Sequence, residues 1–148
     1  NVRYCRKLGF QAFGIDGDKS TIPKDNFFEY VDYRKKSSNF TGPFDLCWCV
    51  EFAEHIEERY ISNFIIDFKK CKALIFSAAP EGWGGVGHVN EQKQEYWIKT
   101  FQTKGFEFKP SVTKEIRKIS TLTFNDKIRN LKKQFIRNRG LFFINTAI

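Results

Sequence analysis

The stretch FDLCWCVEFAEH, residues 44–55, decides the fold of this 148-residue chain. Residues 44–50 are mostly apolar and aromatic and follow a Gly-Pro dipeptide, which is typical of a short buried β-strand. The pattern stops at Glu51, and Glu54 and His55 come within the next four residues. A helix beginning there would place these three side chains on one face. Because ligands of open α/β sheets bind beyond the carboxyl ends of the strands, we expect a functional site here.

On both sides of this stretch, short apolar strands alternate with helices. Strands are expected at 10–15, 27–31, 44–50, 73–78, 106–108 and 141–144. Helices are expected at 2–8, around Ile61, Phe64, Ile65 and Phe68, around Tyr96, Trp97 and Phe101 after a capping Asn90, and at 124–139 with the apolar stripe Phe124, Ile128, Leu131 and Phe135. Such alternation predicts a single α/β domain over residues 1–148, with a mostly parallel sheet and helices on both faces.

The charge of the chain is unevenly distributed. Residues 109–140 carry ten basic and two acidic side chains, whereas the other residues carry fifteen of each, so the net charge of +8 lies in this C-terminal segment. One interpretation is a solvated basic surface, and the other is a surface that recruits an anionic substrate. Aromatic residues do not alternate with the basic ones as they do where single-stranded bases stack, so nucleic acid is the less favoured partner.

Composition also bears on the cellular setting. No apolar run approaches the roughly 20 residues that a membrane helix needs, so no membrane partner is expected. Four cysteines without a C-x-x-C pair do not indicate a disulfide framework, which fits a reducing cytoplasm. The chain begins at Asn1 and contains no Met, and we interpret it as a fragment that lacks upstream sequence.

Three of the predicted strands are followed by an acidic residue, namely Asp16, Asp32 and Glu51. In a parallel sheet these residues would line one edge and face a common crevice. A carboxylate after the second strand of a nucleotide-binding sheet suits a ribose, because it accepts hydrogen bonds from both hydroxyls. For Asp16 taken alone, a turn-forming aspartate is the alternative.

In order and spacing, these motifs resemble those of the class I S-adenosylmethionine-dependent methyltransferases over nearly the whole chain. FGIDGD is similar to the second motif of that family, which implies that Asp16 binds the cofactor ribose. YVDY is similar to the third motif, which implies that Asp32 and Tyr33 flank the adenine. FDLCWCVEFAEHI is similar to the fourth, which passes beneath the methionine portion. The resemblance implies a Rossmann-like sheet with an antiparallel last strand, and it places the Gly-rich first motif upstream of Asn1, so that the domain is N-terminally truncated.

The cluster of Glu51, Glu54 and His55 admits two interpretations. In many members of the family a similar E-x-x-E-H orients the substrate or caps a helix. In the ubiquinone-pathway O-methyltransferases and the small-RNA 2′-O-methyltransferases a similar cluster binds a divalent metal, and in the latter a second histidine comes from the loop after the next strand. His88 follows the glycine-rich residues 82–87 at that place, although it could instead make a hydrogen bond across a mobile loop. Two carboxylates and two imidazoles suit Mg²⁺, Mn²⁺ or Zn²⁺.

The expected function is therefore methyl transfer from S-adenosylmethionine to a hydroxyl of a small molecule or sugar, assisted by a divalent metal held by Glu51, Glu54, His55 and His88. Glu51 and His55 would be the catalytic residues. Trp83, among the glycines of its loop, would either cover the substrate or pack onto the neighbouring helix. One alternative is transfer to nitrogen or carbon without a metal, with His55 as general base. Another is a non-catalytic domain that binds nucleic acid through residues 109–140. Loss of the strand-end acids would barely affect the function of such a domain.

Overall fold

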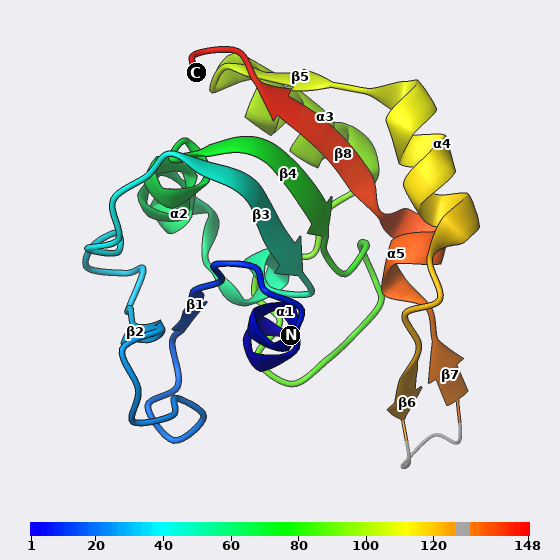
Figure 1. Ribbon diagram of the computed structural model, residues 1–148. Coiled ribbons are helices and arrows are strands. Elements are labelled where there is room, and N and C mark those ends of the chain that lie inside the picture. The colour runs from blue at the N-terminus through cyan, green and yellow to red at the C-terminus, as the bar shows by residue number, and fades with distance from the viewer. Residues whose placement is uncertain (127–130) are drawn as a thin grey trace.

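The computed structural model describes residues 1–126 and 131–148 of the chain (Figure 1). Its strands are β1 (Gly14–Asp16), β2 (Phe28–Tyr30), β3 (Phe44–Val50), β4 (Cys71–Ser77), β5 (Phe106–Phe108), β6 (Phe124–Asp126), β7 (Leu131–Lys133) and β8 (Leu141–Asn145). Its α-helices are α1 (Val2–Lys7), α2 (Ile61–Phe68), α3 (Gln94–Thr103), α4 (Pro110–Ile119) and α5 (Phe135–Arg139). Two short 3₁₀ helices, η1 (Ala53–His55) and η2 (Glu58–Tyr60), lie between β3 and α2.

A four-stranded sheet in the order β3-β4-β8-β5 forms the centre of the molecule (Figure 1). β3 and β4 run parallel, whereas β8 runs antiparallel to both β4 and β5. Three strands therefore share one direction and the last strand of the chain opposes them. The molecule is a mixed α/β structure with a mostly parallel sheet, as the alternation of strands and helices predicts.

A second, two-stranded parallel sheet of β1 and β2 lies beside the β3 edge. Phe13, just before β1, packs 5.7 Å from Phe44 at the start of β3, measured between ring centroids. Tyr33, after β2, packs 5.5 Å from Phe52, which follows β3. These contacts show that β1, β2 and β3 point the same way. The strand-end acids therefore stand at the same end of their strands.

The hydrophobic core lies between the central sheet and the helices α2 and α3. Alternate side chains of a strand face opposite sides of a sheet, so Phe76 of β4 and Phe143 of β8 share one face. The ring of Phe101 in α3 lies 4.8 Å from that of Phe76 and 5.0 Å from that of Phe143. On the opposite face, Leu46 and Trp48 of β3 are 48% and 43% exposed. The expected covering of both faces by helices is therefore not found at β3.

The C-terminal segment differs from the predicted helix over 124–139, which is wrong. β6 and β7 pair antiparallel, and α5 accounts only for the last five residues. Ile128 of the expected apolar stripe lies outside the described residues. The sequence FNDKIRN contains two Asn and one Asp, which favour turns over helix interiors, so the helical spacing of apolar residues was misleading here. α4 is not among the predicted elements, although Pro110 at its first turn is a recognised start signal.

The described part of the chain, residues 1–126 and 131–148, holds no helix with both the length and the apolar character needed to cross a membrane.

Candidate metal centre

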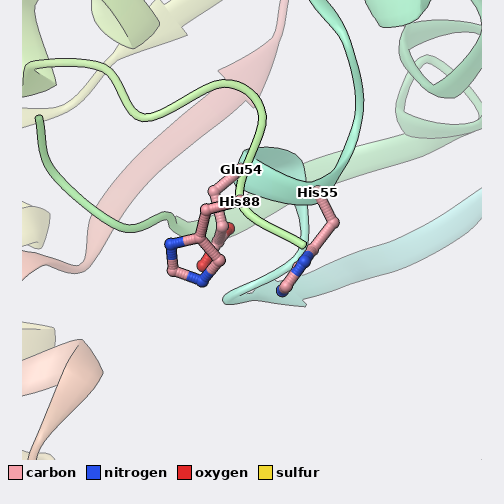
Figure 2. A group of neighbouring side chains, drawn as sticks. All are labelled: Glu54, His55 and His88. Carbon is pink, nitrogen blue, oxygen red and sulfur yellow. The ribbon is translucent and has the colours of Figure 1, made fainter. Parts of the chain in front are cut away.

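Glu54, His55 and His88 converge at the end of β3 (Figure 2). Each offers one potential ligand atom, and these atoms all lie within 4.8 Å of one another. The two imidazole rings are 4.8 Å apart between centroids and meet edge to face at 83°. The convergence that the sequence predicts for these three residues is thus present, with η1 supplying two of them and the loop between β4 and α3 supplying the third.

The chain reaches η1 through an unusual backbone turn rather than through a helix starting at Glu51. Glu51 has a φ of 54°, in the left-handed region that non-glycine residues rarely occupy. The one-turn η1 follows, with Glu54 buried inside it and His55 exposed at its end. Because no helix begins at Glu51, the expectation that Glu51, Glu54 and His55 share one helical face is wrong.

Hydrogen bonds at Asn90 join η1 to the loop that contains His88. The backbone N–H groups of Val89 and Asn90 both donate to the carbonyl oxygen of Glu54, at 2.8 and 3.0 Å. The buried side chain of Asn90 donates through Nδ2 to the carbonyl oxygen of Ile56 at 3.1 Å. Asn90 was predicted to cap the following helix, but α3 begins only at Gln94. Its role in the structure is to hold the two halves of the cluster together.

Both imidazoles are oriented by a hydrogen bond at Nδ1. His55 Nδ1 lies 3.1 Å from the carbonyl oxygen of Gly87, which can only accept, so Nδ1 carries the proton. His88 Nδ1 lies 2.6 Å from Oε1 of Glu91, and this bond holds the pKa of Glu91 below its ordinary value. In each ring Nε2 is the nitrogen that these bonds do not use, which is the arrangement of metal-ligating histidines. Sequence reasoning missed Glu91, although its H-x-x-E spacing from His88 was a usable signal.

The glycines of the loop allow this close packing. A Cβ on Gly85 would overlap the ring of His88. Gly87, whose carbonyl orients His55, has a φ of +74°, a conformation that glycine adopts without strain. The composition of residues 82–87 therefore serves the placement of the two histidines.

Glu54 is the buried member of the cluster, with 1% of its surface exposed. Its pKa is raised to about 7, chiefly by burial and in part by the charge of Glu51, while backbone amides and His88 oppose the rise. Its Oε2 has no hydrogen-bond partner, and within residues 1–126 and 131–148 only one other buried side-chain polar atom, Nε1 of Trp97, shares that condition. A buried carboxylate oxygen without a hydrogen-bond partner, close to two imidazoles, is suited to binding a cation.

Glu51 does not join this cluster, and the four-ligand site expected from the sequence is reduced to three. Its Oε1 accepts from Ser77 Oγ at 2.8 Å and from Arg139 Nε at 3.1 Å. A second contact joins Arg139 Nη2 to Oε2. Arg139 stands 88 positions along the chain, so no local pattern could reveal this ion pair.

The donor set of two imidazole nitrogens and one carboxylate oxygen favours Zn²⁺, Mn²⁺ or Fe²⁺ over Mg²⁺, which prefers oxygen ligands. Ligands about 2.1 Å from one tetrahedral ion lie roughly 3.4 Å apart. The ligand atoms here lie within 4.8 Å of one another, so small side-chain movements would bring them to that spacing. Three protein ligands leave coordination positions open, as catalytic metal sites require. The residues present therefore fit a divalent ion.

A pocket of about 210 Å³ adjoins the Glu51–Arg139 ion pair. Its lining residues are Phe76, Ala78, Pro80, Trp83, Gln92, Gln94, Trp97, Asn138, Arg139 and Leu141. The Trp83 ring lies 4.5 Å from the guanidinium carbon of Arg139. Trp83, proposed from the sequence as a substrate residue, thus forms part of the wall of this pocket.

The three residues expected at the cofactor lie in different environments. Asp16 is exposed, and its Oδ1 accepts from the N–H of Asp18 at 2.9 Å within a turn. Asp32 forms a two-pronged ion pair with Arg34 at 2.8 and 2.9 Å, which lowers the pKa of Asp32 to about 2. Tyr33 is only 5% exposed and donates its hydroxyl to Asp67 at 2.7 Å, so its ring lies in the core and not at the surface.

No family model, curated protein or solved structure matches this chain.

Proposed function

We propose that this protein is a metal-dependent O-methyltransferase that uses S-adenosylmethionine as methyl donor. The observation that carries the proposal is the cluster of Glu54, His55 and His88, with two oriented imidazoles and a buried, unpartnered carboxylate oxygen. It stands at the carboxyl end of β3, where open α/β sheets bind ligands. The reaction, methyl transfer, is inferred from the sequence motifs that resemble those of the methyltransferase family.

For the cofactor, Asp16 is the strongest ligand on this chain. It is exposed at the end of β1, and within the described residues it forms no ion pair. Both oxygens of Asp32 are engaged by Arg34, and Tyr33 is buried. We therefore assign ribose binding to Asp16 and give Asp32 and Tyr33 the role of holding the β2 end in place.

In the metal-assisted reaction, Glu54, His55 and His88 would hold the ion while Gly87 and Glu91 keep both imidazoles in the Nδ1-protonated form. The ion, when bound, would lower the pKa of a substrate hydroxyl, so that the hydroxyl proton passes to solvent. The oxygen would then form the new bond to the methyl carbon as the S–CH₃ bond breaks, with S-adenosylhomocysteine as the leaving group. Glu51 acts through Arg139, which it positions at the mouth of the pocket. His55 is then a ligand and not the general base of a metal-free reaction.

The test of the cofactor assignment is calorimetry of S-adenosylmethionine binding to the wild type and to Asp16→Asn. The amide oxygen of Asn can still accept from the Asp18 N–H, so the turn is kept and only the charge is lost. We expect affinity to fall by roughly 2–4 kcal/mol, the contribution of a pair of charge-assisted hydrogen bonds. Asp45→Asn, at a carboxylate 91% exposed near the start of β3, is the matched control. Equal affinities for wild type and Asp16→Asn would remove the ribose assignment.

The test of metal dependence is methyl transfer to a panel of polyols before and after chelation. Chelated protein should lose turnover and regain it with Mn²⁺ or Zn²⁺, whereas Glu54→Gln should not regain it. If a chelator leaves turnover unchanged, the cluster positions the substrate and does not hold a catalytic metal.

A second candidate, metal-dependent hydrolysis, is favoured by one observation. Two imidazoles and one glutamate are also the donor set of zinc hydrolases. Metal binding without any affinity for S-adenosylmethionine would favour this candidate over methyl transfer.

A further inference from the structure

The pocket beside the Glu51–Arg139 pair has room for one ring-sized group. Its volume is about 210 Å³, below the roughly 300–1,000 Å³ that encloses a drug-sized ligand. Phe76 of β4, Trp97 of α3 and Trp83 of the glycine-rich loop form apolar walls. Neither a nucleotide nor a peptide segment would fit inside it whole.

The polar groups of the pocket are mostly side-chain amides. Gln92 donates through Nε2 to Asn90 at 3.1 Å, which leaves its carbonyl oxygen as an acceptor. Gln94 accepts from Arg117 at 2.8 Å, which leaves its NH₂ group as a donor. Asn138, exposed on α5, offers both kinds of group. Hydroxyl groups also both donate and accept, so they match these amides.

The pocket carries almost no free charge. Arg139 is the only charged residue among those that line it, and Glu51 binds its guanidinium group through both oxygens. An anionic ligand would have to compete with that carboxylate for the guanidinium. A neutral ligand would not, so the electrostatics select against phosphate and carboxylate groups.

From these features we propose that the pocket binds a neutral, hydroxyl-rich ring such as one hexopyranose unit, with its C–H face packed on Trp83. An indole ring offers a broad apolar surface for such a face. The guanidinium of Arg139 lies over the Trp83 ring, but the side chain is 43% exposed, so part of it is accessible. Trp97, which is 2% exposed, lies behind it as part of the apolar wall.

The pocket shares a wall with the candidate metal centre, so the proposal deepens the proposed function by naming the class of its methyl acceptor. Ala78 and Pro80 line the pocket. Ala79 lies between them, and a hydrogen bond from its backbone N–H to the Glu54 carboxylate lowers the pKa of that group. Gln92 of the pocket binds Asn90, whose N–H donates to the carbonyl of Glu54. Binding of the ring itself does not depend on metal or S-adenosylmethionine and is tested separately.

The experiment follows the three indole N–H signals in ¹H–¹⁵N spectra while methyl hexopyranosides are added to the whole protein. Two of the three tryptophans, Trp83 and Trp97, line the pocket, and Trp48 lies outside it. We expect saturable shifts of the Trp83 and Trp97 signals with Trp48 unchanged. The 6-phosphates of the same sugars should bind at least tenfold more weakly.

Trp83→Ala should weaken pyranoside binding about tenfold through loss of the packing surface. Trp48→Ala is the matched control, because Trp48 is also 43% exposed, and it should bind like the wild type. No saturable shift with any neutral pyranoside, equal loss in both variants, or a preference for the phosphates would each overturn the proposal. Failure of metal or S-adenosylmethionine binding alone would overturn the proposed function and leave the sugar pocket standing.

Discussion

At the scale of single residues, Glu54 couples the candidate site to stability. Burial raises its pKa from 4.5 to about 7. In the unfolded chain the group ionises near its ordinary value, so between about pH 4.5 and 7 the folded protein holds a proton that the unfolded chain has lost. The free energy of unfolding of the metal-free protein should therefore fall as pH rises through this window. The total loss is on the order of 3 kcal/mol.

Glu54→Gln cannot ionise and should remove this pH dependence. Urea unfolding at pH 5 and pH 8, with a chelator present, measures it, and the variant should be the more stable protein at pH 8. Glu81→Gln, at an exposed glutamate of the following loop, controls for loss of one surface charge. Added Zn²⁺ or Mn²⁺ should then stabilise the wild type and not Glu54→Gln, because only an ion bound to the folded state shifts the equilibrium. Parallel pH profiles for wild type and Glu54→Gln would contradict this account.

At the scale of elements, the loop between β4 and α3 fixes the geometry of the centre. Because a Cβ on Gly85 would overlap the His88 ring, Gly85→Ala should displace that ring without removing a ligand. We expect metal affinity to fall 10- to 100-fold, the range seen when groups that orient metal ligands are altered. Calorimetric titration with Zn²⁺ measures this. Gly17→Ala is a suitable control, since its Cβ would meet only an ordinary contact, at 3.6 Å. Wild-type affinity in Gly85→Ala would show that His88 is not a ligand.

Features encoded locally were predictable from the sequence, and features made by distant contacts were not. The apolar run predicted β3 with the bounds that the structure has, and the four apolar positions predicted to lie on a helix all fall within α2. The ion pair of Glu51 with Arg139 could not be predicted, because it depends on α5 lying near the end of β3. No local sequence pattern encodes that contact. Asn90 was misassigned for a related reason, because capping is a local property and its actual partner is the backbone of η1.

At the scale of the whole molecule, the basic segment favours an anionic substrate, whereas the pocket favours a neutral group. The net charge of +8 lies in residues 109–140, but the structure divides that segment among α4, the β6–β7 pair and α5 instead of placing it on one helix. Lys132 and Lys133 belong to β7, and Arg137 is an exposed residue of α5. Lys127 and Arg129 lie outside the described residues. A substrate that satisfies both features has a neutral ring for the pocket and an anionic remainder for the basic segment.

Under the proposed methyl transfer, such a division predicts different salt dependences for two acceptors. For an acceptor sugar linked through its anomeric oxygen to a nucleotide, with the phosphates outside the pocket, KM should rise steeply with ionic strength, because screening weakens attraction to residues 109–140. For the free methyl glycoside, KM should change little with ionic strength. For both acceptors, kcat should be independent of ionic strength. Neutralising Lys132, Lys133 and Arg137 together to Gln should raise KM for the charged acceptor at low salt and leave the glycoside unaffected. If the triple variant and the wild type share one KM for the charged acceptor at every ionic strength, the basic segment serves only as a solvated surface.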